Sequence, residues 1–407
     1  MIIIIKFKRK MDEFINKKNL IIENDFKINE KSLNSQKNLI NARQNFSLQH
    51  TLIAKGIASL MLLFHHLLRP GNKFTKLLKN ELIIFGIDLR KYSSIFFKIT
   101  TCTYTFLSGI GMYYSLHKLK NIKDMYKKCL KNFFKLMIIF WIILLFSFPK
   151  GLKTGLFNLK YSTIVSCIFA DYHRKGNWWY IRMHFALLIY SPLFIRLIQN
   201  INYKKKIIPI LFFYSFYSII KAIQQSYKIK GMKAIVFDYF NYFSSIEIIL
   251  SFLSGILSAK YNVMYFFNNN TIESFYYSIF SIFSSIFIRC NLITEEGSTK
   301  IDFFIVPLFI LPITSLISVN KTISNLSKLF GKHSTNFWFI HGYFYDNYYI
   351  KLLAYPKYSL LCYIWLVILT LITSYIINII LVPSINYINN KGFNYKGYFH
   401  FINKNTI

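Results

Sequence analysis

A lysine and two histidines inside one apolar segment are the residues of this sequence whose types and spacing point most directly to chemistry. Lys55, His65 and His66 fall within residues 52–68, which are long enough to cross a bilayer as a helix. A charge at the bilayer centre costs about 2.5–3.5 kcal/mol or more and usually marks function. A helix turns by about 100° per residue, so Lys55 and His66 share one face, about 16 Å apart along the axis, whereas His65 points roughly a quarter turn away. The segment predicts a cation near one membrane surface and an acid/base group near the other.

The elements that position these residues are expected to be transmembrane helices. The chain is 54% hydrophobic and 19% aromatic over 407 residues, which is far more apolar than a soluble domain. Only helices or closed barrels satisfy their backbone groups in lipid. We therefore predict an all-α, polytopic protein with about ten transmembrane helices, at 52–68, 93–115, 132–149, 178–198, 205–221, 243–259, 270–289, 301–319, 334–352 and 359–383. A weaker run, 161–170, is too short to span and is expected to be re-entrant or interfacial.

The formal net charge of +34 first suggests nucleic-acid binding. We reject that interpretation because the lysines are dispersed through every loop between the apolar runs, and no separate soluble segment could present them. No nucleic-acid partner is expected. Lysine-rich cytoplasmic loops should instead attract anionic lipid headgroups of the bilayer.

The distribution of charge also predicts the orientation and the boundaries. Residues 1–47 are rich in lysine and arginine, which favours a basic cytoplasmic tail, and they lack the order of a signal peptide. Ten spans would return the C-terminus to the same side. We expect a ten-helix domain at 48–385 and a short basic cytoplasmic tail at 386–407, with no appended extracytoplasmic domain. The location expected is a membrane, the bacterial inner (plasma) membrane by preference.

The sequence motifs of common metal, redox, phosphate-binding and hydrolase sites are absent. The five cysteines have neither metal nor redox spacing, and no glycine-rich phosphate loop or nucleophile elbow is present. We expect no metal site and no permanently bound cofactor. Any chemistry should therefore come from side chains gathered between helices.

Several charged side chains fall in the outer half of the membrane together with His66 if the N-terminus is cytoplasmic. Lys98 is expected to reach the headgroups and Asp302 to cap a helix. Arg182 and Glu247 are harder to explain by a structural role, because an isolated carboxylate in lipid is neutralised or paired. Two interpretations stay open for them: an ion pair with each other, or an Arg182 that faces a substrate.

The order of the motifs resembles the acyltransferase-3 family of integral-membrane acyltransferases. The resemblance runs from about residue 48 to residue 385 and is carried by Lys55-Gly56-Ile57-Ala58 with His66, Phe106-Leu107-Ser108-Gly109-Ile110, Asn177-Trp178-Trp179-Tyr180-Ile181-Arg182 with Leu187-Leu188-Ile189-Tyr190-Ser191-Pro192, Phe252-Leu253-Ser254-Gly255-Ile256-Leu257, and Gly331-Lys332-His333-Ser334 through Phe339-Ile340-His341. Members move an acyl group, commonly acetyl from acetyl-CoA, onto hydroxyls of cell-envelope glycans or related molecules.

The resemblance implies roles for individual residues. His66 takes the position of the family's essential histidine, and Lys55 falls where many members have arginine. The family's Arg-x-x-Arg corresponds to Lys128 and Lys131, where lysine keeps the charge but loses the bidentate fork. His341 matches a further histidine, for which catalysis and a structural hydrogen bond to a carbonyl are equally open.

A coherent mechanism follows from that resemblance. A neutral imidazole can take the proton of an attacking hydroxyl near pH 7, which gives His66 the role of general base. Lys55, Lys128 and Lys131 would bind the phosphates of acyl-CoA at the inner face. The acceptor, an extracytoplasmic or lipid-linked glycan, would approach from the outer side and bind to Trp178, Trp179 and Glu247. Arg182 or His341 would stabilise the oxyanion.

A competing interpretation is a multi-span transporter that uses intramembrane His, Glu and Arg. Against it, the sequence shows no internal repeat. A member that binds without turnover is a third possibility. His65, His184 and His333 have no counterpart in the resemblance and are expected to be structural. The sequence leaves the acceptor open among lipopolysaccharide, capsule, peptidoglycan, exopolysaccharide, lipid-linked sugars and small molecules.

Overall fold

A computed structural model describes residues 46–69, 73–79, 82–84, 86–153, 179–200, 246–267, 272–292, 301–345 and 349–392. The chain divides into two units, Met1–Ser47 and Leu48–Ile407, and every helix named below belongs to the second. The span expected at 205–221 and the weaker run at 161–170 lie outside the described residues.

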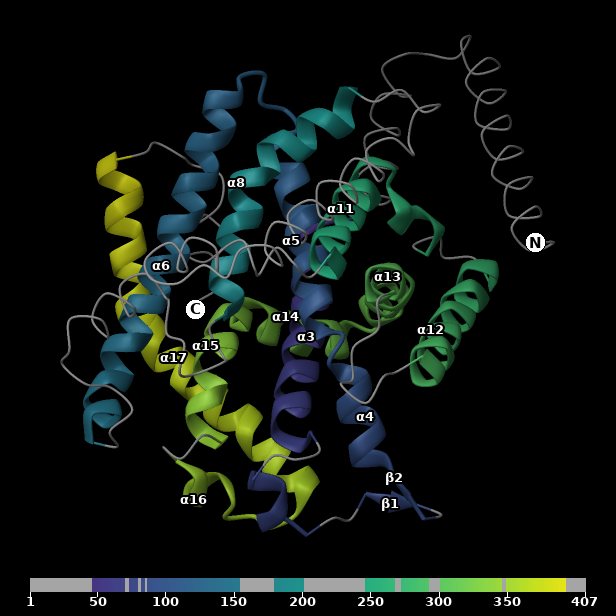
Figure 1. Cartoon of the computed structure of the whole chain (residues 1–407), viewed down its shortest axis with the longest axis vertical. Helices are drawn as coiled ribbons and strands as arrows, with labels where there is room; N and C mark the ends of the chain where they lie inside the picture. Colours follow the sequence, from purple (N-terminus) through teal and green to yellow (C-terminus); the bar gives the residue numbers. More distant parts are fainter. Residues whose placement is uncertain are drawn as a thin grey trace, which may run out of the picture. The chain divides into compact units, whose positions relative to one another are not determined.

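The described part of the second unit is built almost entirely of helices (Figure 1). They are α3 (Leu48–Leu68), α4 (Leu89–Phe97), α5 (Thr100–Leu116), α6 (Ile122–Lys153), α8 (Trp179–Asn200), α11 (Ile246–Lys260), α12 (Ile272–Leu292), α13 (Asp302–Val319), α14 (Lys321–Lys332), α15 (Ser334–Tyr345), α16 (Ile350–Leu353) and α17 (Ser359–Gly392), with two 3₁₀ turns, Lys73–Leu77 and Val263–Phe266. The short strands β1 (Ile83–Ile84) and β2 (Ile87–Asp88) pair antiparallel as a hairpin. Within the ranges that the structure describes, four helices are long and apolar enough to cross a membrane: α3, α6 over Ile122–Phe146, α13, and α17 over Ser359–Pro383. The predicted all-α membrane class is confirmed.

At two of the expected spans, the structure has two shorter helices in place of one continuous helix. The run at 93–115 is interrupted, because α4 ends at Phe97 and α5 begins at Thr100. In place of a single helix at 334–352, the structure has α15, which ends at Tyr345, and the one-turn helix α16. Twelve helical residues rise only about 18 Å, which is too short to cross the hydrocarbon core of a bilayer.

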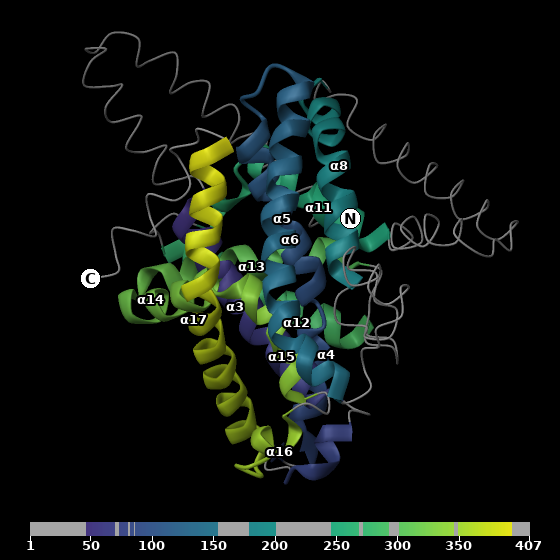
Figure 2. The ribbon, with the colours of Figure 1, turned by 90° about the vertical axis from the view of Figure 1, so that its left-hand side faces the viewer.

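Helix α14 was not predicted. Its sequence alternates lysines with apolar side chains, so a search for continuous apolar runs passes over it. The helix runs across the long helices rather than along them (Figure 1, Figure 2). It packs against α3 and leads directly into α15.

Glycines set the closest helix crossings. A Cβ added at Gly56 of α3 would overlap the backbone carbonyl of Ser327 in α14, and one added at Gly331 would overlap the carbonyl of Leu52. Gly109 and Gly255 make the same kind of approach between α5 and α11. Small residues let helix backbones meet closely inside a membrane, where dispersion replaces the hydrophobic effect as the driving force. These four motif glycines therefore fix how α3 and α5 are held by their neighbours.

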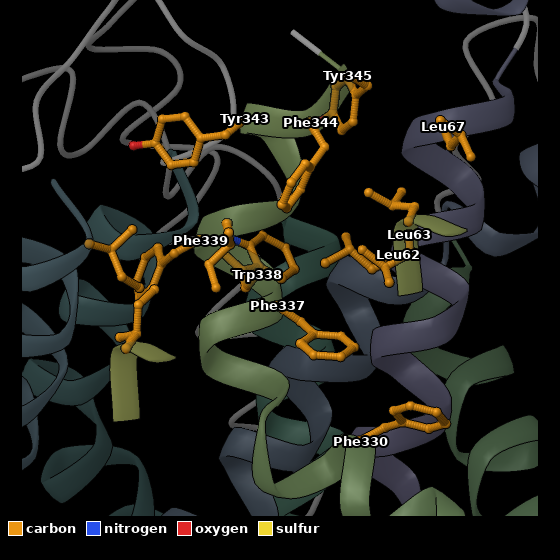
Figure 3. Packing of buried hydrophobic residues seen from close by; sticks show 14 of the residues in the cluster. Leu62, Leu63, Leu67, Phe330, Phe337, Trp338, Phe339, Tyr343, Phe344 and Tyr345 are labelled. Atoms are coloured by element: carbon orange, nitrogen blue, oxygen red, sulfur yellow. The ribbon is translucent and has the colours of Figure 1, made fainter. Parts of the chain in front are cut away.

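The core beside α3 comes largely from α6, α15 and α17, with Phe330 added from α14. Phe330 and Phe337 project toward α3, which carries Leu62 and Leu63, whereas Tyr343 points away from that helix (Figure 3). A second apolar cluster joins α5, α8 and α11. Because α3 contacts α4, α5, α13, α14, α15 and α17, its polar face is enclosed by other helices rather than by lipid alone.

Candidate active site

Helix α3 presents a polar line along one face. Lys55, Ser59 and His66 lie four and seven residues apart, so they recur on the same side of the helix. Ser59 Oγ donates to the Lys55 carbonyl at 2.8 Å and lies 2.8 Å from the hydroxyl of Tyr104 on α5. At Ser59, the polar face predicted from spacing is therefore covered by α5.

His66 faces a second imidazole. Its ring centroid lies 4.9 Å from that of His341 on α15, with an interplanar angle of 51°. Tyr345, one turn after His341, stacks nearly parallel to His66 at 6.1 Å and 8°. The structure thus brings together His66 and His341, which the sequence singled out, and adds Tyr345, which it did not. His66 and His341 are called the histidine pair below.

The hydrogen bonding of His341 defines its free nitrogen. Nδ1 lies 2.9 Å from the carbonyl oxygen of Phe337, and since a carbonyl only accepts, Nδ1 carries the proton. Nε2 is then the atom with a lone pair in the neutral ring. That atom is buried and has no hydrogen-bond partner among the residues that the structure describes. A buried nitrogen of this kind is an available acceptor for a substrate proton.

His65 has a different environment from its neighbour. Its Nδ1 lies 2.6 Å from the carbonyl oxygen of Ser94 in α4, to which it donates. The prediction that the two adjacent imidazoles point to different surroundings is confirmed. The bond to a backbone carbonyl supports the structural role expected of His65.

Aromatic side chains line the way from the histidine pair back toward Lys55. Trp338, one turn before His341, packs edge-on to Tyr104 at 5.1 Å and against Tyr180 of α8 at 4.6 Å. Tyr180 in turn stacks on His184 at 5.8 Å, and His184 lies within electrostatic range of Lys55. Trp338 Nε1 and His184 Nδ1 are buried without a hydrogen-bond partner among the described residues. These side chains form an aromatic row between Lys55 and the histidine pair.

Lys128 and Lys131 lie near the start of α6, away from the histidine pair. Lys128 Nζ donates to the carbonyl of Ser115 at 2.8 Å, in the last turn of α5, where a cation complements the exposed carbonyls of a helix end. Lys131 Nζ is buried one turn further on. The structure therefore gives Lys128 a structural contact beside any role in binding phosphate.

Four of the residues expected to meet the acceptor can be placed only in part. Trp178 lies outside the described residues, and the side chains of Trp179 and Arg182, in the first turn of α8, lie outside them as well. Glu247 is in the first turn of α11 and half-buried, and its charge acts on Cys102 of α5. The Arg182–Glu247 ion pair stays a prediction.

A buried ion pair that the sequence did not reveal lies close to His65. Arg289 Nε and Nη2 donate to the two carboxylate oxygens of Asp302 at 3.0 and 3.1 Å, and Arg289 is fully buried. The expectation that Asp302 caps a helix is wrong, because Ile301 is the N-cap of α13 and the carboxylate is used by Arg289. Arg289 stands at the end of an apolar run, where a cation is usually interpreted as interfacial. Its partner is thirteen residues away on another helix, which hydropathy does not detect.

Among the described residues, no three His, Cys, Asp or Glu side chains are arranged to hold a metal ion. The chemistry that this arrangement can perform is proton transfer by imidazole. The ring centroids of His66 and His341 are 4.9 Å apart, so a group bound between helices α3 and α15 would meet both imidazoles.

Comparison with known proteins identifies the family of the chain. Residues 53–382 match the model of a family described as an acyltransferase domain, which covers α3 through the membrane-spanning part of α17. No curated protein and no solved structure matches the chain. The match includes the histidine pair, the four crossing glycines and the aromatic row. The chain belongs to the acyltransferase-3 family and is an integral-membrane enzyme that transfers acyl groups other than aminoacyl groups.

Proposed function

We propose that this enzyme transfers an acyl group from cytoplasmic acyl-CoA to a hydroxyl of an extracytoplasmic or lipid-linked cell-envelope glycan. The acyl group that we propose is acetyl. The observation that carries the proposal is the contact of His66 with His341 inside the segment that matches the family. His66 acts as the general base. The bilayer, the acyl donor and the acceptor are the partners of the reaction.

The chemical step is a displacement at the thioester carbonyl. The acceptor oxygen forms the new C–O bond, the C–S bond of acyl-CoA breaks, and the CoA thiolate leaves. His66 takes the proton of the acceptor hydroxyl as the oxygen attacks. The proton is then available to the departing sulfur, so no other reactant is required.

His341 is suited to accept a hydrogen bond rather than to donate one. Because its proton is on Nδ1, bound to the Phe337 carbonyl, Nε2 can orient either the acceptor hydroxyl or a ring N–H of His66. This disfavours His341 as the group that stabilises the oxyanion. Arg182 is left as the proposed donor to the oxyanion, because a guanidinium remains charged and can donate two parallel hydrogen bonds.

The donor is proposed to lie along the aromatic row. Lys55 stands at one end of the polar face of α3 and the histidine pair at the other, about 16 Å apart. A pantetheine arm carries amide groups, and Trp338 Nε1 and His184 Nδ1, which have no hydrogen-bond partner in the part of the chain that the structure describes, are suited to bind them. Lys55, Lys128 and Lys131 would then neutralise the phosphates at the cytoplasmic face.

The acceptor is proposed to approach from the opposite membrane surface. Trp178 and Trp179 would stack on sugar rings, and Glu247 would accept hydrogen bonds from sugar hydroxyls. This requires cytoplasmic N- and C-termini, as the basic N-terminal segment favours. The membrane proposed is the bacterial inner membrane.

A reconstitution experiment tests the proposal. Purified protein in proteoliposomes would receive acetyl-CoA labelled in the acetyl group on the cytoplasmic face, with and without short glycans on the other face. We expect release of the CoA thiol and labelling of the glycan, both lost in His66→Ala. Entry of label into the vesicles without thiol release would contradict the proposal and support the transporter alternative.

A further inference from the structure

The interruption between α4 and α5 lies beside His65, the residue that precedes His66 on α3. Helix α4 ends at Phe97, and Lys98 and Ile99 form a turn before α5 begins. Breaking a helix leaves carbonyl groups without their usual intrahelical donors, and in a membrane those groups must find others. The backbone N–H groups of Lys98 and Ile99 donate back to the carbonyls of Ile95 and Phe96 at 3.2 and 3.3 Å, and two further donors come from other helices.

The first donor is His65. The carbonyl of Ser94, in the last turn of α4, accepts from His65 Nδ1 at 2.6 Å. Ser94 is itself fully buried, so the contact is shielded from water. The imidazole that precedes His66 in the chain is thus fastened to the end of α4.

The second donor is Arg289. Its Nη1 donates to the carbonyl of Ile95 at 2.8 Å, and its guanidinium lies 5.6 Å from the ring centre of Phe96. The remaining guanidinium nitrogens are held by both oxygens of Asp302. One rigid, planar fork therefore joins α12, α13 and the end of α4.

The two contacts are on consecutive carbonyls, so a shift at one is transmitted to the other. We propose that the Arg289–Asp302 ion pair is a positioning element for His66, acting through the end of α4 and His65. The proposal rests on the proposed role of His66 as the base. Asp302 fixes the guanidinium, Arg289 fixes the Ile95 carbonyl, and the neighbouring Ser94 carbonyl fixes His65. His66, the next residue on α3, is thereby held against His341.

The expected magnitude follows from the demands of proton transfer. Displacing a reacting group by about 1 Å from a distance can cost on the order of 10²-fold in rate. Loss of the Arg289–Asp302 ion pair should reduce kcat and leave the KM for acyl-CoA nearly unchanged, because Lys55 and the aromatic row do not depend on α4. A purely structural role would lower stability and would not change kcat per folded molecule.

Two variants test this without leaving a buried charge alone. Arg289→Lys keeps the charge opposite Asp302 but loses the fork. The double variant Arg289→Met with Asp302→Leu removes both charges, and replacing a buried ion pair by apolar side chains is often neutral or stabilising. We expect kcat to fall by up to about tenfold in both variants, with the KM for acyl-CoA within about twofold. The matched control, Asn336→Ala, removes a buried polar group far from α4 and should leave kcat within about twofold.

A double-mutant cycle tests the route of the effect. If Arg289 acts through His65, the combination of Arg289→Lys with His65→Ala should lower kcat little more than the stronger single variant does. Wild-type kcat in the folded Arg289→Met, Asp302→Leu protein would overturn the proposal, as would multiplicative effects in the cycle. Retained transfer in His66→Ala would instead overturn the proposed function.

Discussion

Two buried histidines, His333 immediately before α15 and His341 near its end, differ in whether their nitrogen atoms have hydrogen-bond partners among the described residues. At the start of α15, His333 Nδ1 lies 2.7 Å from Ser374 Oγ, and Asn336 Nδ2 donates to Ser374 Oγ at 2.7 Å and to Asn378 Oδ1 at 2.9 Å. These four residues form a polar cluster that ties α15 to α17. At its end, His341 has one nitrogen bound to the Phe337 carbonyl and the other, Nε2, without a partner among the described residues.

The difference separates a structural use of polar side chains from a chemical one. A buried polar group without a hydrogen bond costs about 1–3 kcal/mol of stability, so such a group usually has a functional reason. The side chains of the polar cluster hydrogen-bond to one another. The histidine pair leaves a nitrogen available at the place where a substrate would supply the missing partner. One short helix therefore carries both an anchor and a reactive group.

The comparison is tested first by replacing His341 and, separately, His333 with glutamine. His341→Gln removes the Nε2 acceptor, so we expect turnover to fall on the order of 10²-fold, with protein that still inserts and binds acyl-CoA. His333→Gln should lower thermal stability and keep turnover within about threefold. Steady-state acyl transfer, normalised to folded protein, measures both. Equal losses of turnover would erase the distinction between the two ends.

The polar cluster can be broken from its other side. Asn336→Ala removes the donor to Asn378 Oδ1 and one of the two partners of Ser374 Oγ, which should destabilise the protein by about 1–3 kcal/mol. Thermal unfolding in detergent measures the loss. Unchanged stability would mean that the cluster does not anchor α15, and a kcat reduced tenfold or more would assign it a role in the reaction.

The smallest effects are expected at the cationic end of the aromatic row. Lys55→Met removes a charge from the polar face of α3 and should raise the KM for acyl-CoA on the order of tenfold with a smaller change in kcat. Lys128→Met should raise it only about threefold, since Lys128 Nζ already binds the Ser115 carbonyl. Initial rates over a range of acyl-CoA concentrations separate the two parameters. A donor KM that is the same in both variants and the wild type would remove the lysines from the donor site.

Helical periodicity alone predicted the most useful feature of the site, the shared face of Lys55 and His66 and the divergence of His65. That prediction succeeded because residues of one helix keep fixed angles whatever surrounds it. The partners of the face were not accessible in the same way. Tyr345 and Trp338 were missed, although their i+4 and i−3 spacing from His341 is a signal that could have found them.

Hydropathy predicted where most helices lie and failed where tertiary contacts override apolarity. The break at Lys98–Ile99 is compensated by donors from His65 and Arg289, which no local window contains. The Arg289–Asp302 ion pair was missed for the same reason: each charge stands at the end of an apolar run, and only packing shows that they meet. Helix α14 escaped because its lysines lower the mean hydropathy of a helix whose small face is buried.

The most direct test of the account compares His66→Ala with His65→Ala in membrane-inserted protein. Loss of a general base costs on the order of 10² to 10⁴ in turnover, so His66→Ala should be nearly inactive while it still binds acyl-CoA. His65→Ala should lose far less, about tenfold, because it removes only the contact with the Ser94 carbonyl. An inserted His66→Ala protein with near-normal acyl transfer, beside an inactive His65→Ala, would contradict the assignment of His66 as the base.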